Sequence, residues 1–383
     1  MRQLLPRRPA ARRATATIVA VAVILGLSAF GGTSGITDPT ASIEPVVAGE
    51  PISDERCETN RDAGTITYLT GFDFAATASM IDVFVAEARG YFDDLCLDVE
   101  IQPSFSTANY PLVASGEAQF ASAGSFSEVL NFAAANDADL VTLSVEGRTP
   151  IDALILKPGT AEALADLDGA IIGVKGKLPP SIAAMLASAG LFEGEDFDTV
   201  LLDGFDPVAH LALDGIVGFP GYKSNEPGAL ERAGIEFELF DPIDYDIPGS
   251  FGVTYTGADF AEDHPTATQD FVRAMMRGLA DALADPAAAA QIAIDLVTAG
   301  GNPNYLSPEG EAFRWETDAA LLTASYADGE ALGVPDLELL QAEVDAYSEV
   351  GLFPETPPAL ADVVDVELVA SVYDDEQQVI WPG

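Results

Sequence analysis

A short segment after an apolar run, residues 219–227, combines an aromatic ring, an amide and a carboxylate in Tyr222, Asn225 and Glu226. The amide donates and accepts hydrogen bonds, the carboxylate accepts them, and an aromatic ring can cover a flat apolar surface. The set therefore suits a flat heterocycle that carries N–H groups. The same residues also suit the start of a helix, with Pro227 at its first position, and the sequence leaves both interpretations open.

Motifs of the common catalytic sites are absent from the sequence. It contains no G-x-S-x-G, no H-E-x-x-H and no phosphate-binding P-loop. Its two histidines, His210 and His264, have no nearby cysteine that would complete a zinc site. Lys175 and Lys177 could take a Schiff-base role, but no motif accompanies them. We therefore expect a protein that is not an enzyme and that uses no cofactor or metal.

The net charge excludes several classes of partner. The 383 residues include 62 Asp and Glu against 17 Lys and Arg, which gives a formal charge of -45. Nucleic acids and anionic membranes both attract a basic surface, so neither is expected as a partner. The acidity is consistent with solubility, or with adaptation to salty surroundings, which the scarcity of lysine would also fit.

The N-terminus has the pattern of an export signal. Five arginines precede an apolar stretch at about residues 14–30, and small residues follow. We expect a signal peptide or N-terminal anchor at residues 1–30 and a flexible tether at residues 31–60. The folded part would then be extracytoplasmic, either secreted or associated with the cell surface. The export route, Sec or twin-arginine, stays open.

The chain has only two cysteines, Cys57 and Cys96, and each precedes a strand-like run. If those two strands are parallel neighbours, both cysteines lie at the same end of the sheet. An exported chain with two cysteines favours a disulfide between them. Two unpaired buried thiols are the alternative.

Strand-like and helix-like segments alternate over the first two thirds of the chain, which predicts an α/β fold with mostly parallel sheets. Ser79 is a candidate N-cap for the first of these helices. Strands are expected at residues 65–70, 97–102, 119–123, 141–145, 152–157, 170–174, 199–202 and 215–217, and helices at 80–89, 111–115, 126–135 and 180–189.

The C-terminal third is predicted to be helical. Apolar residues recur every four positions from Phe271 to Leu283, which indicates a helix with one buried face. Asp285 is expected to cap a second helix that begins at Pro286. Further helices are expected at residues 315–326 and 337–350.

Two stretches one hundred residues apart repeat the same pattern. Glycine, phenylalanine and aspartate recur in register as Gly90/Gly190, Phe92/Phe192 and Asp98/Asp198. The repeat indicates two units of similar topology, with chance as the alternative.

Several segments, in order along residues 63–300, carry a resemblance to a known family. They are VFVAEARGYF with LDVEI, LVASGEAQFASAG, DGIVGFPGYKSNEPGALERAGI, IDYDIPG and HPTATQDFVRAMMRGLADALADP. Together they resemble substrate-binding proteins of ABC importers, in the branch that serves nitrate, sulfonates, taurine and thiamine-pyrimidine precursors. The last three segments are similar to the thiamine-precursor subgroup. Cys96 replaces the glycine that is usual before Leu97 in this branch, which fits a disulfide.

The resemblance implies a two-lobed periplasmic-binding-protein type II fold. Lobe I would comprise residues 61–150 and 252–383, and lobe II residues 151–251, with crossing strands near residues 145–156 and 248–256. The ligand would lie in a cleft between the lobes, at the carboxyl ends of strands. Binding would close the lobes by a hinge motion, and the closed protein, a monomer, would deliver its ligand to a permease and its ATPase.

The expected ligand is a small heterocycle, either a thiamine pyrimidine precursor or a flavin-like ring. Nitrate, sulfonate or taurine would need fixed positive charge, and the strand ends offer only Lys175, Lys177, Lys223 and Arg148. These anions remain an alternative, as do a pyrimidine-precursor biosynthetic enzyme of the same fold and a sensor or adhesion module. Core packing is the alternative role for Phe72 and Phe126. The expected ligand-binding residues are Asp73, Phe74, Ser79, Ser122, Ser125, Phe126, Lys177, Phe219, Tyr222, Asn225, Glu226 and Tyr245.

Overall fold

The computed structural model describes residues 45–302, 306–353 and 356–383. The chain divides into two units, Met1–Ala41 and Ser42–Gly383, and the described residues all belong to the second. The expected export signal and the first part of the expected tether lie outside the described residues.

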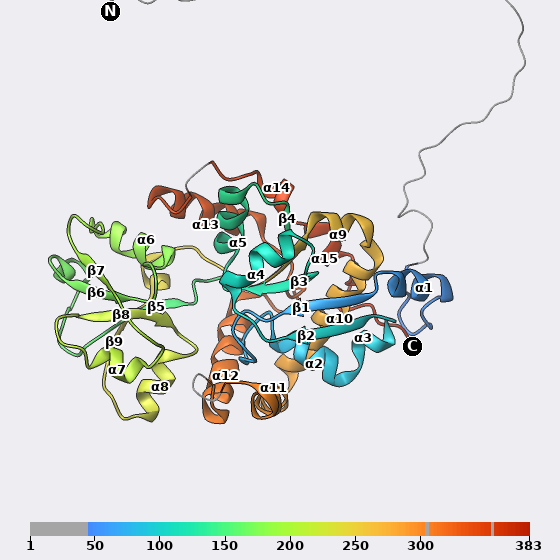
Figure 1. Cartoon of the computed structure of the whole chain (residues 1–383), viewed down its shortest axis with the longest axis horizontal. Helices are drawn as coiled ribbons and strands as arrows, with labels where there is room; N and C mark the ends of the chain where they lie inside the picture. Colours follow the sequence, from blue (N-terminus) through green and yellow to red (C-terminus); the bar gives the residue numbers. More distant parts are fainter. Residues whose placement is uncertain (1–44, 303–305, 354–355) are drawn as a thin grey trace, which may run out of the picture. The chain divides into compact units, whose positions relative to one another are not determined.

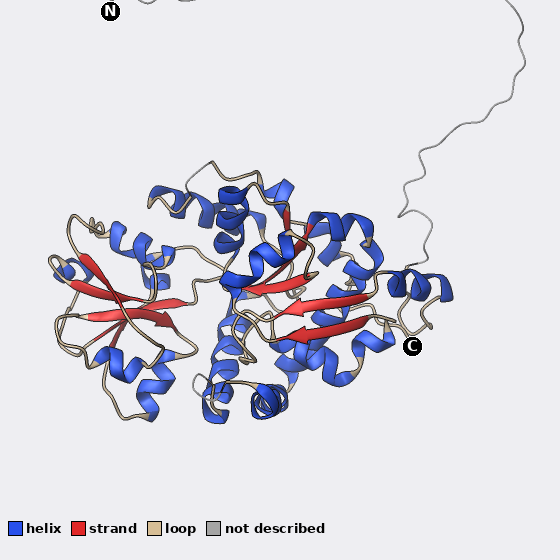
Figure 2. Cartoon of the chain, in the orientation of Figure 1, coloured by secondary structure: helices blue, strands red, loops and turns tan. Residues whose placement is uncertain are grey.

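The first sheet has the strand order β2-β1-β3-β10-β4 (Figures 1 and 2). Its parallel strands are β1 (Thr65–Leu69), β2 (Asp98–Gln102) and β3 (Phe120–Ala123). Strand β10 (Phe251–Gly257) is antiparallel to both β3 and β4 (Leu140–Gly147). A strand from late in the chain therefore occupies an interior position of this sheet.

The second sheet has the order β7-β6-β8-β5-β9. Strand β6 (Ile171–Val174) is parallel to β7 (Asp198–Leu201) and β8 (Gly218–Tyr222). Strand β5 (Asp152–Leu156) is antiparallel to β8 and to β9 (Glu238–Phe240). We use lobe I for the first sheet with the helices packed on it, and lobe II for the second sheet with α6, α7 and α8.

The expectation of mostly parallel sheets is wrong, because four strand pairs are parallel and four antiparallel. The antiparallel pairs all involve β5 or β10, the strands next to the connections between the two sheets. The predicted similarity of the two units is confirmed. In each sheet one strand lies between its two parallel neighbours, β1 between β2 and β3, and β6 between β7 and β8.

Helices flank both sheets and make up the C-terminal third, as predicted (Figure 2). Lobe II carries α6 (Pro180–Ser188), α7 (Pro207–Leu211), α8 (Glu226–Arg232) and the 3-10 helices η1 (Leu164–Leu167) and η2 (Pro242–Tyr245). The remaining helices are α1 (Asp54–Asp62), α2 (Ile81–Arg89), α3 (Tyr91–Asp94), α4 (Ser106–Ala114), α5 (Phe126–Asn136), α9 (Ala258–Asp263), α10 (Pro265–Ala284), α11 (Pro286–Gly300), α12 (Pro308–Ser325), α13 (Leu337–Glu349), α14 (Leu360–Val363) and α15 (Val366–Ala370).

Three predicted boundaries are wrong. The tether prediction fails from Asp54 onward, because Ser53 caps α1 by accepting the Arg56 N–H at 3.2 Å. Helix α4 starts at Ser106 and keeps Pro111 inside it, whereas the proline was expected to open the helix. Strand β8 begins at Gly218 rather than at residue 215. Glycine usually indicates a turn in a sequence. Here a Cβ at Gly218 would lie 2.0 Å from the Ile155 carbonyl oxygen, so the close approach of β8 to β5 requires a glycine.

The expected apolar face of α10 forms the core of lobe I. Phe271, Met275 and Leu279 are fully buried, and the Phe271 ring stacks on Phe120 of β3 with centroids 4.0 Å apart. A Cβ at Gly278 would lie 2.1 Å from the Asp82 carbonyl oxygen, so this glycine lets α10 lie directly against α2. The predicted cap of α11 is also confirmed, since the Asp285 carboxylate accepts the Ala288 N–H at 3.1 Å.

The predicted disulfide between Cys57 and Cys96 is present, with Cα atoms 5.3 Å apart. Strands β1 and β2 are parallel neighbours, so the two cysteines do lie at one end of the sheet. A buried ionic group beside them joins α1 to α10, because Asp270 accepts from Arg56 Nε at 2.7 Å and from Arg273 Nε at 3.0 Å. The segment before β1 is therefore fixed to the core of lobe I.

No single helix among the described residues is long and apolar enough to cross a membrane. Helices α10 and α11 meet that criterion only together, as a pair bent by 115°.

Candidate ligand-binding site

The loops that follow the parallel strands of the two sheets approach one another. Tyr222, the last residue of β8, reaches the β3–α5 turn of lobe I, where a Cβ on Gly124 would lie 2.8 Å from its hydroxyl oxygen. Phe72, after β1, meets Phe205, after β7, with ring centroids 6.0 Å apart and edge to face. Ligands of open α/β sheets bind at these carboxyl ends, so this junction is the candidate site.

Aromatic rings line one side of the junction. Phe72 also contacts Phe105 edge to face at 5.4 Å, and the ammonium of Lys175 lies 5.7 Å from the centre of the Phe205 ring. Phe105 and Phe205 are 43% and 44% exposed, so both rings present apolar surface at the junction. The rings come from both lobes.

A buried carboxylate anchors the lobe II side. Glu226 is the first residue of α8 and is 3% exposed. One of its oxygens pairs with the Lys175 ammonium, and the other accepts the Tyr222 N–H at 2.8 Å. The Lys175–Glu226 pair thus ties the loop after β6 to the end of β8.

Asn225 does not cap α8, although it occupies the N-cap position. Its side-chain oxygen instead accepts from Nη2 of Arg314, on α12, at 2.9 Å. The helix-capping interpretation of Asn225 is therefore wrong.

Two further polar groups surround Gly124. The carboxylate of Glu128 would lie 3.0 Å from a Cβ placed there, and the Tyr222 hydroxyl comes still closer. Tyr222 is 39% exposed, and its phenol is protonated at neutral pH, so the hydroxyl can donate a hydrogen bond. Glu128 of lobe I and the expected residue Lys177 of lobe II are both exposed to solvent.

In the loop between β1 and α2 (residues 70–80, the β1 loop), Ser79 joins Ser122 of β3 through their hydroxyls at 2.6 Å, and both are buried. Ser79 has φ 61° and does not cap α2, whose N-cap is Met80, so the capping prediction is wrong. Ser125 does cap a helix, since its hydroxyl accepts the Glu128 N–H at the start of α5 at 3.4 Å.

Other expected ligand-binding residues lie away from the junction or serve the loop itself. Phe126 and Phe219 are fully buried in the cores of lobe I and lobe II, and Phe219 belongs to β8 rather than to a loop. Tyr245 packs near Phe240 at 6.3 Å. The carboxylate of Asp73 accepts the Phe74 N–H of its own loop at 2.9 Å and the N–H of Asn302, which follows α11, at 2.7 Å.

Phe74 is half-buried, edge to face with Phe84 at 6.1 Å, and its contact with a ligand ring stays a prediction. The junction also contains residues that were not expected, namely Phe105, Glu128, Phe205 and Arg314. Phe205 follows a predicted strand, so the rule that selected residues 219–227 could have found it. Arg314 carries no such signal, because only the tertiary fold brings α12 to the site.

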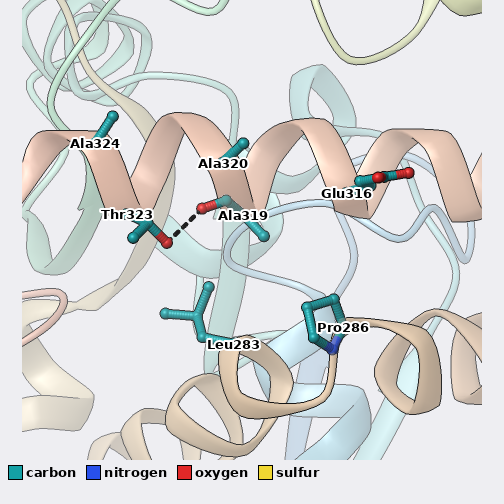
Figure 3. A pocket seen from close by; sticks show the side chains of 7 residues that line it. All are labelled: Leu283, Pro286, Glu316, Ala319, Ala320, Thr323 and Ala324. Atoms are coloured by element: carbon teal, nitrogen blue, oxygen red, sulfur yellow. Dashed lines mark hydrogen bonds between the residues drawn. The ribbon is translucent and has the colours of Figure 1, made fainter.

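A separate groove of about 450 Å³ lies between α12 and the α10–α11 corner (Figure 3). Small and apolar side chains line most of it, and Glu316 supplies its only charge. It lacks the convergent polar groups of a specific small-molecule site, so the interlobe junction is the better candidate. Among the described residues, no group of three or more His, Cys, Asp or Glu side chains could hold a metal ion.

Comparison with known proteins identifies the family. The sequence profile described as NMT1/THI5 like matches residues 77–289, more than half of the chain, and the chain belongs to this family. A riboflavin-binding protein of Chloroflexus aurantiacus is 34% identical over 134 residues, which are 34% of this chain and 38% of that protein. A formylaminopyrimidine-binding protein of Halalkalibacterium halodurans is 28% identical over 236 residues, 58% of this chain and 69% of that protein.

Solved structures show the fold. The periplasmic aliphatic sulphonate binding protein SsuA of Escherichia coli superposes with a TM-score of 0.60 at 14% identity, covering 78% of this chain and 91% of that one. The expected periplasmic-binding-protein type II fold and the resemblance to substrate-binding proteins of the thiamine-precursor branch are both confirmed. The chain spans little more than a third of the riboflavin-binding relative.

Proposed function

We propose that this chain is an extracytoplasmic solute-binding protein that captures a small flat heterocycle between its lobes and delivers it to the permease of an ABC importer. One observation carries the proposal. Phe72 of lobe I meets Phe205 of lobe II at the carboxyl ends of the strands, beside the Lys175–Glu226 pair and the Tyr222 hydroxyl. Aromatic rings can cover the flat face of such a ligand, and polar groups can form hydrogen bonds with its edge.

The charges at the junction favour a heterocycle over an anion. Carboxylates pair with three of the four cations that the sequence offered for nitrate or a sulfonate, Lys175 with Glu226, Lys223 with Asp241 and Arg148 with Glu330, and Arg314 pairs with Glu311. The fourth, Lys177, is exposed and forms no ion pair with the described residues. An anion at Lys175, Lys223 or Arg148 would therefore have to displace a carboxylate, whereas the N–H groups of a heterocycle can share it.

The relatives support the same class of ligand. The two named above bind riboflavin and formylaminopyrimidine, both of which contain flat nitrogen rings. Both are named as binding proteins, which supports capture rather than catalysis. Export and the permease partner rest on the fold shared with periplasmic binding proteins and on the N-terminal sequence pattern.

The roles of the side chains follow from their hydrogen bonds. The protonated Tyr222 hydroxyl would donate to a ring nitrogen or carbonyl. Glu226 would accept a ligand N–H while the Lys175 ammonium, which has three donors, keeps its pairing. Ligand contacts from both lobes would stabilise the closed arrangement, because only that arrangement supplies them together.

Calorimetric titration with riboflavin, formylaminopyrimidine, nitrate and taurine tests the proposal. We expect measurable binding of a heterocycle and no binding of nitrate or taurine. Glu226→Gln should weaken heterocycle binding about ten-fold or more, because a hydrogen bond to a buried charge contributes roughly 1.5–3 kcal/mol.

Glu231→Gln is the matched control, since it makes the same change at an exposed position of α8 and should leave the dissociation constant unchanged. Tighter binding of nitrate or taurine than of either heterocycle would contradict the proposed ligand class. Equal dissociation constants for Glu226→Gln and Glu231→Gln would remove Glu226 from the site.

A further inference from the structure

Helix α12 carries three buried charged side chains on one face. Glu311, Arg314 and Asp318 are 0%, 5% and 0% exposed, and spacings of three and four residues place them in one row. Burying a charge is costly unless it is paired and hydrogen-bonded. The row therefore needs partners, and it finds them in both lobes.

The two acidic members of the row hold the β1 loop of lobe I. Glu311 Oε2 accepts the Ala76 N–H at 2.7 Å, and Asp318 Oδ2 accepts the Ala78 N–H at 3.0 Å and the Thr77 hydroxyl. This loop also carries Phe72, which lies at the junction. The row thus fixes the backbone of the lobe I side of the site.

Arg314 holds the lobe II side. Its Nε donates to Glu311 Oε2 at 3.1 Å, and its Nη2 donates to the Asn225 side-chain oxygen at 2.9 Å. The guanidinium holds several donors in a rigid planar fork, so Arg314 serves a carboxylate and an amide at the same time in one fixed geometry.

The surrounding packing keeps the row at the lobe junction. Helix α8 lies directly on α12, because a Cβ at Gly228 would be 2.4 Å from the Phe313 ring. Loop 222–226 therefore faces the same row that holds the β1 loop.

We propose that Arg314, which lies between Glu311 and Asn225, is a positioning residue that links loop 222–226 of lobe II to the β1 loop of lobe I. This link, called the clasp below, would set the spacing of the ligand-binding groups. The inference rests on the proposed function for its effect on affinity. Its effect on the spacing of the lobes does not depend on the ligand.

Small-angle scattering of the ligand-free protein tests the clasp directly. Arg314→Lys keeps the charge but removes the planar fork that joins Glu311 to Asn225, so we expect a larger radius of gyration than in the unmodified protein. Asn225→Ala removes the same contact from the other side and leaves Arg314 paired with Glu311, so it should expand the protein in the same way even if Arg314→Lys folds poorly. Arg232→Lys is the matched control, because its guanidinium lies 5.8 Å from the Phe313 ring of the same helix pair but outside the row.

Affinity is the second readout, with riboflavin and formylaminopyrimidine as probes. We expect Arg314→Lys to raise the dissociation constant about ten-fold or more, mainly through faster dissociation, and Arg232→Lys to leave it unchanged. Unchanged scattering in both Arg314→Lys and Asn225→Ala would overturn the clasp. If the unmodified protein binds neither probe, the proposed ligand class fails while scattering still decides the clasp.

Discussion

Replacing both cysteines with serine should lower the free energy of unfolding by about 4 kcal/mol. The disulfide joins residues 39 positions apart, and the chain-entropy relation for a loop of that length gives about 13 cal/mol/K, or about 4 kcal/mol at 25 °C. The folded state keeps other ties at this place. Asn60 Nδ2 donates to the Leu95 carbonyl oxygen at 2.8 Å, and Arg56 pairs with Asp270. The loss should therefore act through the unfolded chain, with the native structure retained.

Urea denaturation followed by circular dichroism measures this difference. Cys57→Ser/Cys96→Ser is compared with the unmodified protein, and both are repeated with a reductant, which should destabilise only the unmodified protein. Near-ultraviolet spectra of the two folded proteins should coincide. A difference below about 1 kcal/mol, or two titratable thiols in the unreduced denatured protein, would refute the reasoning.

Two further predictions concern a buried acid and a close helix contact. Burial raises the pKa of Asp152 to about 7, so the folded protein holds a proton that the unfolded chain releases near pH 4. The free energy of unfolding should therefore fall between about pH 4 and 7, by at most about 1.4 kcal/mol per pH unit. Asp152→Asn should flatten that part of the pH profile, measured by urea denaturation. The same slope in the variant would contradict the role of Asp152. Gly278→Ala should destabilise the protein by about 1–3 kcal/mol, because its Cβ would lie 2.1 Å from the Asp82 carbonyl oxygen. Gly300→Ala, which meets no atom closer than 3.9 Å, is the control in the same denaturation assay, and equal losses would show that packing is not the cause.

Local patterns predicted much of the fold. The α10 face was predictable because burial repeats with the helical period, and the disulfide because two cysteines leave one pairing. Strand β8 was misplaced because its glycine and proline residues resemble turn signals, whereas Gly218 and Gly221 make room for Ile155 and Glu226. Local sequence does not show which glycines are needed because another segment of the chain packs closely against them.

The candidate site was predicted less well than the fold. Tyr222 and Glu226 could be selected because they follow a strand, and the structure brings both to the junction. Phe126 and Phe219 satisfied the same rule but face the cores, since an aromatic side chain near a strand end suits either place. Arg314 could not be found from the sequence. It contacts Asn225 directly and Ala76 by way of Glu311, and both Asn225 and Ala76 lie far from it in sequence.

The interior position of β10 has a consequence for the order of events during synthesis. The strands of lobe II all lie between Asp152 and Phe240, so its sheet can close as soon as that stretch has emerged. Lobe I has to wait, because β4 reaches β3 only through β10, and α10 follows β10 in the chain. Contacts across such a long intervening loop form slowly, since closing the loop costs entropy before packing compensates it. A nascent chain that stops before Phe251 would therefore present a complete second lobe beside a first lobe whose sheet is still divided.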